Sequence, residues 1–170
     1  MSTSAPTALG AWRRFTAAYA TFLTWLLAAS VAILVFPVSL QIFSRFTELL
    51  PHYIWTEEMA RFCLVWMIML GAMLGVREGT HFIVDVFPSA TGRFGALLNL
   101  FASLAVLVFA LIFAWFGVEY TRFAWNRTSE LADLPLWMIH VAWPITGVTW
   151  LVFLGEHLVA QWRTLVGSPA

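Results

Sequence analysis

One stretch of the sequence decides the fold: residues 55–76 read WTEEMARFCLVWMIMLGAMLGV. The charge-free part from Phe62 to Val76 would reach only about 22 Å as a helix, whereas the hydrocarbon core of a bilayer is about 30 Å thick. A helix that crosses a membrane here therefore brings Glu57, Glu58 and Arg61 to the membrane edge or inside it. Ionised side chains at that depth are costly, so they normally face protein or a water-filled cavity and pair with one another. The stretch predicts a membrane-spanning helix with a functional cluster of charges at one end.

The composition places the whole chain in a membrane. Of its 170 residues, 61% are hydrophobic and 11% are charged, with a mean hydropathy of +0.83, whereas charged residues make up about a quarter of a soluble domain. The formal net charge is zero and no basic run is present that could meet a phosphate backbone, so nucleic acid is not expected as a partner. The single cysteine, Cys63, cannot form a disulfide within the chain. The sequence predicts an integral membrane protein surrounded by a lipid bilayer.

Long apolar runs predict four membrane-spanning helices. The spans fall at about residues 15–43, 55–76, 94–118 and 134–158. They form one all-α, four-helix transmembrane unit over residues 13–170, with short loops, after a flexible amino-terminal tail over residues 1–12. Arginines are more numerous on the side that holds both chain ends, which predicts cytoplasmic amino and carboxyl termini. The arginines assigned to that side are Arg13, Arg14, Arg77, Arg93 and Arg163, against Arg45, Arg122 and Arg127 outside.

The second predicted helix carries a distinctive face, which we name the charged stripe. At about 100° per residue, its members fall within roughly 40° of a common line; they are Glu57, Arg61, Leu64, Ile68, Gly71 and Gly75. Glu57 and Glu58 both lie within helical pairing distance of Arg61, and the two glycines form a small-xxx-small step that lets another helix approach closely. We interpret the stripe, together with Glu58, as a subunit interface that docks a helix of this chain or of a partner. The alternative is an acidic first turn that is stabilised by the helix dipole and solvated at the headgroups.

A second polar pattern follows directly after this span. If the segment is helical, Arg77, His81 and Asp85 step along one face at i,i+4 intervals. This spacing suggests a cytoplasmic-side contact with a partner. A solvated connector with a local pair between Arg77 and Asp85 is the alternative.

Taken in order, these residues resemble the small membrane subunit of tripartite ATP-independent periplasmic (TRAP) transporters, the DctQ-like proteins. The resemblance rests on Glu57-Glu58-x-x-Arg61 and Gly71 in the second span, Arg77-Glu78-Gly79-x-His81-x-x-x-Asp85 after it, and Leu134-Pro135-Leu136-Trp137 followed by Pro144 in the fourth. With the length and the four-span layout, it covers nearly the whole chain.

The resemblance implies a non-catalytic scaffold subunit in the bacterial inner membrane. Its partners would be a large membrane transport subunit and a periplasmic substrate-binding protein. The assembled transporter would import an organic acid, driven by a sodium gradient, while the small subunit braces its fixed part. No cofactor is expected, and sodium is not expected to bind this subunit.

Two other functions compete with this interpretation. A membrane cytochrome needs two imidazoles at one depth on facing helices; His81 and His157 would lie near the cytoplasmic side, and His140 near the opposite one. A self-sufficient small transporter needs a charge near the bilayer midplane, where only His140 and Asn99 offer polar groups. The sequence has no zinc-like ligand spacing and no nucleophile with a nearby histidine and acid, so neither a metal site nor an enzyme is expected.

Overall fold

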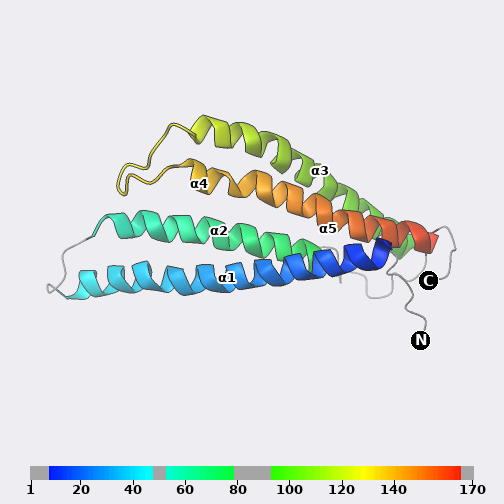
Figure 1. Cartoon of the computed structure of the whole chain (residues 1–170), viewed down its shortest axis with the longest axis horizontal. Helices are drawn as coiled ribbons and strands as arrows, with labels where there is room; N and C mark the ends of the chain where they lie inside the picture. Colours follow the sequence, from blue (N-terminus) through cyan, green and yellow to red (C-terminus); the bar gives the residue numbers. More distant parts are fainter. Residues whose placement is uncertain (1–7, 48–52, 79–92, 166–170) are drawn as a thin grey trace.

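The computed structural model describes the backbone of residues 8–47, 53–78 and 93–165 and, within them, the side chains of residues 10–47, 53–78 and 101–155. The elements are α1 (Ala8–Phe46), α2 (Trp55–Glu78), α3 (Arg93–Ala124), the short α4 (Trp137–His140) and α5 (Ala142–Leu165) (Figure 1). Four segments among them are long and apolar enough to cross a membrane, in α1, α2, α3 and α4 with α5, which confirms the predicted all-α membrane fold. Helices suit a bilayer core because they satisfy the backbone N–H and C=O groups within their own segment.

The helices lie side by side in the order α1, α2, α5, α3 (Figure 1). α2 packs against α1 on one side and against α5 on the other, and α5 in turn packs against α3. The start of α1 and the end of α5 lie at the same end of the molecule. The cytoplasmic assignment of that end stays a prediction from the arginine distribution. We refer to the opposite end, which holds the start of α2 and the end of α3, as the outer end.

Two aromatic side chains form hydrogen bonds between helices that are distant in the sequence. The hydroxyl of Tyr19 on α1 lies 2.8 Å from Oγ1 of Thr149 on α5. The indole N–H of Trp150 on α5 donates to the carbonyl of Ala72 on α2 at 3.0 Å. These bonds lie beside the apolar core, whose most buried large side chains include Met73 and Phe153. α5 is therefore fixed to both α1 and α2.

The backbones of α3 and α5 approach each other closely at two glycines. A Cβ atom added to Gly147 would lie 2.4 Å from the backbone nitrogen of Ala114 and 2.7 Å from the carbonyl oxygen of Ala110. A Cβ atom added to Gly117 would lie 2.6 Å from the nitrogen of Pro144. Two glycines on facing helices thus allow α3 and α5 to touch along their backbones.

The fourth span differs from the prediction of a single helix over residues 134–158. Residues 134–136 belong to the preceding loop, and the helix is interrupted at Val141 between α4 and α5. Pro144 explains the interruption, because it has no N–H to donate to the carbonyl of His140 and its ring crowds that carbonyl. Apolar composition extends through this region, which is why the sequence pattern alone did not place the break.

Other helix ends also lie beyond the predicted boundaries, and α5 continues to Leu165, past the predicted end at residue 158. α1 begins at Ala8, so residues 8–12, which were assigned to a flexible tail, are helical; they are mostly alanine and leucine, which favour helices. α3 continues to Ala124, past the predicted end of the third span at residue 118. The prediction stopped before Glu119 because it was the first charge. A single charge does not end a helix, because glutamate is itself a good helix former.

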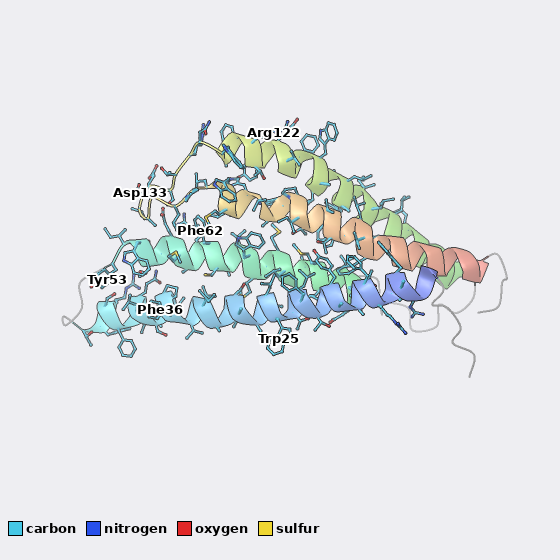
Figure 2. The ribbon with its side chains drawn as sticks, viewed as in Figure 1. Trp25, Phe36, Tyr53, Phe62, Arg122 and Asp133 are labelled. Carbon is cyan, nitrogen blue, oxygen red and sulfur yellow. The ribbon has the colours of Figure 1, made fainter. Side chains whose placement is uncertain are left out.

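Much of α1 faces away from the other helices. Trp25 and Phe36 are 72% and 66% exposed on its outer surface (Figure 2). In water, large apolar side chains exposed along a whole helix would be unfavourable, whereas lipid tails are as apolar as the side chains themselves. The exposed surface of α1 is thus compatible with contact to lipid.

Candidate functional site

The charged stripe lies on the outward side of α2. The buried side of this helix carries Phe62, Met69, Met73 and Val76, and at about 100° per residue the stripe falls roughly opposite to it. Within the stripe, Glu57 and Arg61 are exposed. Leu64 is 43% and Ile68 56% exposed, so the described helices leave the part of the stripe from Glu57 to Ile68 uncovered.

Gly71 of the stripe differs in its surroundings from the glycines that pack α3 on α5. A Cβ atom added to Gly71 would meet no other atom within 4 Å. Gly75, one turn further along α2, is half-buried. No described helix of this chain therefore packs closely on Gly71, and the space beside it is open to an outside partner.

Glu58 has a different role from the one predicted for it. Its side chain is only 6% exposed, and it points away from the stripe toward the loop of residues 125–136 that joins α3 to α4. The hydroxyl of Ser129 and the N–H of Ala132, the latter at 2.7 Å, donate to its Oε2 atom. The N–H of Leu131 donates to its Oε1 atom at 3.2 Å. Glu58 is thus an acceptor that fastens the outer loop to the start of α2.

The structure shows no direct ion pair between Arg61 and either Glu57 or Glu58, although all three side chains are described. Arg61 is exposed, and its charge acts on Glu58 without direct contact. The reason is that Glu58 lies about 100° around the helix from Glu57. It therefore meets the loop, whose N–H and O–H groups satisfy its charge directly.

The outer loop is also held by its own hydrogen bonds. The N–H of Ser129 donates to the carbonyl of Leu134 at 2.8 Å, and the N–H of Leu134 donates back to the hydroxyl of Ser129 at 3.2 Å. The N–H of Leu136 donates to the carbonyl of Arg127 at 2.9 Å. Asp133, in the loop (Figure 2), has a positive φ of 51°, a conformation that aspartate tolerates better than most residues. No periodic pattern in the sequence predicts this arrangement, because the arrangement depends on the turn and on Glu58.

The predicted cytoplasmic-side contact is only partly within the described residues. Arg77 is half-buried at the end of α2, with its guanidinium carbon 5.9 Å from the centre of the Phe153 ring on α5. His81 and Asp85 lie outside the described residues. The structure therefore places Arg77 against α5. The predicted contact face of Arg77, His81 and Asp85 stays a prediction.

The polar residues that suggested haem or autonomous transport are placed as follows. Nδ1 of His140 lies 2.6 Å from the carbonyl oxygen of Leu136, and its ring centre is 4.1 Å from that of Tyr120. Both contacts are ordinary for a half-buried histidine beside a helix break. The side chains of Asn99 and His157, and all of His81, lie outside what the structure describes. Within the described residues, no group of three or more His, Cys, Asp or Glu could hold a metal ion.

Comparison with known proteins identifies the family. Residues 34–164 match the family of tripartite ATP-independent periplasmic transporters, DctQ component. The C4-dicarboxylate TRAP transporter small permease protein DctQ of Rhodobacter capsulatus is 32% identical over 100 residues, which cover 55% of this chain and 43% of that protein. The protein of the same name from Vibrio cholerae is 28% identical over 142 residues, covering 69% of this chain and 60% of that protein.

A third relative is larger. The isethionate TRAP transporter permease protein DctMQ of Oleidesulfovibrio alaskensis is 24% identical over 145 residues, which cover 81% of this chain but only 23% of that protein. The aligned part is less than two thirds of the length of each of these three relatives. The family match nevertheless covers most of the present chain and includes the end of its first apolar helix and most or all of the other three. The chain therefore belongs to the DctQ family of TRAP transporter small permease subunits and is a multi-pass protein of the bacterial inner membrane.

Proposed function

We propose that this chain is the non-catalytic scaffold subunit of a sodium-driven TRAP transporter, and that it docks a large membrane transport subunit on the charged stripe of α2. A periplasmic binding protein would deliver the organic acid, and sodium would bind elsewhere in the complex. The observation that carries the proposal is the stripe itself, which lies opposite the buried side of α2 and whose part from Glu57 to Ile68 is not covered by the described helices. The names of the relatives support an organic anion as substrate, since they specify C4-dicarboxylates and isethionate.

The composition of the stripe favours a protein partner over lipid. Exposed Leu64 and Ile68 alone would suit lipid tails equally well. Glu57 and Arg61, however, lie in the first two turns of a span of 24 residues, where charged side chains normally find protein partners. The space beside Gly71 is open, so the backbone of a partner helix could approach α2 closely there, as helices do at small residues in membranes. The permease protein DctMQ further supports assembly with a larger subunit, because a region similar to this chain there makes up only 23% of a longer permease chain.

Gly71→Leu is the sharpest test of this docking. Because a Cβ atom at Gly71 meets nothing within 4 Å, the isolated variant should reach the membrane in normal amount and unfold at the same temperature. A partner helix seated there would be pushed away, so the yield of co-purified large subunit should fall several-fold, and uptake with it. Gly155→Leu on α5 is the matched control, since its added Cβ also meets nothing within 4 Å. Equal yields of complex from the two variants would exclude close packing on Gly71.

Arg61→Ala tests the charged end of the stripe separately. Glu58 is satisfied by the outer loop and Arg61 is exposed, so the variant should fold as the wild type does. Assembly should weaken, because a partner's polar groups lose their cation at the membrane edge. Arg45→Ala removes an exposed arginine at the end of α1 and should leave assembly unchanged. Pull-down of the large subunit from membranes that co-express both chains distinguishes the two variants, and equal retention would contradict a role for Arg61.

A further inference from the structure

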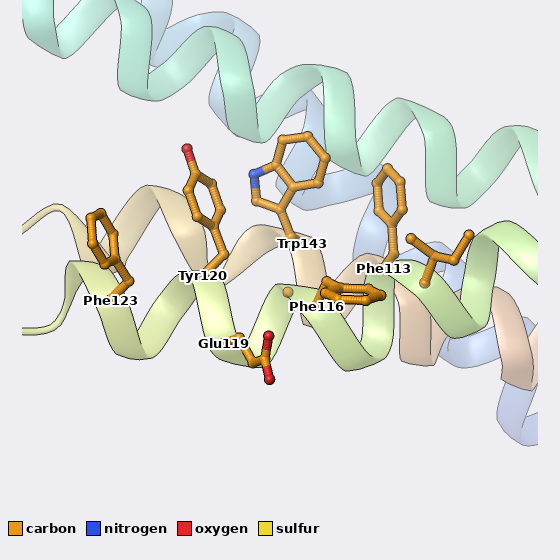
Figure 3. A pocket seen from close by; sticks show the side chains of 8 residues that line it. Phe113, Phe116, Glu119, Tyr120, Phe123 and Trp143 are labelled. Carbon is orange, nitrogen blue, oxygen red and sulfur yellow. The ribbon is translucent and has the colours of Figure 1, made fainter.

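A groove on α3 and α5 has a chemistry different from that of the charged stripe. It has a volume of about 550 Å³ and an apolar lining to which Ile112, Phe113, Phe116 and Phe123 of α3 and Trp143 of α5 contribute. Tyr120 and Glu119 lie toward its outer part. Figure 3 shows four rings in a row, those of Phe123, Tyr120, Trp143 and Phe113. In the same view Phe116 and Glu119 lie across the α3 ribbon from this row. The groove is thus a concave apolar surface with one carboxylate.

Glu119 is unusual because of its depth. It lies inside the spanning segment Phe101–Ala124, about 7 Å along the helix axis from the end at Ala124. Its side chain is exposed, and the structure shows no ion pair for it within the described residues, not even with Arg122 one turn further out. An ionised carboxylate at this depth is costly without a cation. The groove therefore favours an occupant that carries a positive charge at its outer end.

The side chains of the groove favour a flexible chain over a helix as the rest of the occupant. Helices that pack in membranes meet through small residues, whereas this surface is built from bulky rings at Phe113, Phe116 and Trp143. Gly117, the one small residue in the lining, already packs against Pro144 of α5. Bulky rings leave narrow hollows between them, which an acyl chain can follow and a rigid helix cannot.

Aromatic rings also mark the level of the headgroups. Trp125 and Trp137 face each other with ring centres 5.5 Å apart just beyond the outer end of the groove. Tryptophan settles at the boundary between tails and headgroups. Glu119 then lies slightly below that boundary and Ile112 about two turns deeper. The carboxylate of the groove therefore lies at the level of a lipid headgroup of the outer leaflet, and the apolar residues lie at the level of the acyl chains.

We propose that this groove binds one aminophospholipid of the outer leaflet, with the headgroup ammonium on the carboxylate of Glu119 and an acyl chain along Phe116 and Ile112. The site is separate from the charged stripe, so it does not depend on the proposed docking of a large subunit. It gives α3 a specific lipid contact at the edge of the helix row that is distant from α1.

Native mass spectrometry of the purified full-length chain tests the proposal, with phosphatidylethanolamine and phosphatidylglycerol as the two probes. The wild type should retain phosphatidylethanolamine with a preference of roughly fivefold, the size expected for one partly exposed ion pair. Glu119→Gln should abolish the preference while leaving the melting temperature unchanged. Glu130→Gln, which removes an exposed carboxylate of the outer loop that does not line the groove, should keep it. Equal retention of the two lipids by the wild type would overturn the proposal whatever the variants do.

A photo-crosslinking residue at Phe116 in intact membranes separates lipid from protein as the occupant. The side chain of Phe116 is 58% exposed and lines the groove. A lipid adduct that carries an ethanolamine headgroup is the expected product, and it should decrease when Glu119 is replaced by glutamine. A crosslink to a basic segment of another membrane protein, in place of the lipid adduct, would overturn the proposal.

Discussion

Gly147→Leu is expected to destroy the packing of α3 on α5 and to leave little folded protein in the membrane. The first added carbon alone would lie 2.4 Å from the backbone nitrogen of Ala114 and 2.7 Å from the carbonyl of Ala110. These are backbone atoms in the middle of a helix, so they cannot rotate away as a flexible side chain could. Overpacking of a core typically costs about 1–3 kcal/mol and more where backbone must move. Here the two helices would have to separate along their main contact.

Thermal unfolding in detergent, followed by tryptophan fluorescence, measures this effect. Gly147→Ala should lower the melting temperature, and Gly147→Leu should lower it further or prevent purification. Gly155→Leu is the control on the same helix, because the added side chain enters open space. If Gly147→Leu melts at the wild-type temperature, the close contact between α3 and α5 is not present in the folded protein.

Glu58→Gln is expected to release the outer loop while leaving α2 intact. The carboxylate accepts bonds at both oxygens, from Ser129 and Ala132 at Oε2 and from Leu131 at Oε1. Glutamine has the same size but replaces one oxygen with an NH₂ group. This group is a donor, so it could not accept a hydrogen bond from the loop's N–H and O–H groups. Bonds to a charged acceptor are also stronger than bonds to a neutral one. The loop then loses the tie that joins it to a helix more than 70 residues earlier in the chain.

Hydrogen exchange of the peptide that covers residues 125–136 measures the release. We expect exchange to become several-fold faster in Glu58→Gln, since local opening exposes the N–H groups of the loop. Glu57→Gln, one residue earlier on the exposed side of α2, should exchange at the wild-type rate. Equal exchange in the two variants would show that Glu58 does not hold the loop. Because Glu58 is adjacent to the charged stripe, Glu58→Gln should also weaken assembly if the partner contacts the loop.

Glu57 and Glu58 show how far the sequence could predict the site. Their charge and position predicted a polar cluster at the end of a span, and the charged stripe follows from helical periodicity alone. The stripe is indeed on the outward side of α2. Which acid faced outward and which faced the loop could not be predicted, because no local pattern connects Glu58 to Ser129, 71 positions later.

The glycines show a similar limit. The small-xxx-small spacing of Gly71 and Gly75 suggested close packing, yet a Cβ atom added to Gly71 meets nothing within 4 Å, whereas Gly117 and Gly147 lie against the backbone of a facing helix. Spacing identifies glycines that could allow close approach on one helix. It cannot say which glycine faces a second helix, because that depends on how the two helices are rotated when they pack.

Apolar length and helical periodicity are properties of neighbouring residues, so the four membrane-spanning segments of this protein and the charged stripe on one of them could be predicted from the sequence. Three features depend on tertiary contacts instead: the bonds of Glu58 to the outer loop, the position of α5 between α2 and α3, and the close contact at Gly147. A polar group or a glycine acquires its partner from residues that folding brings beside it, and the identity of those residues is not contained in the local pattern.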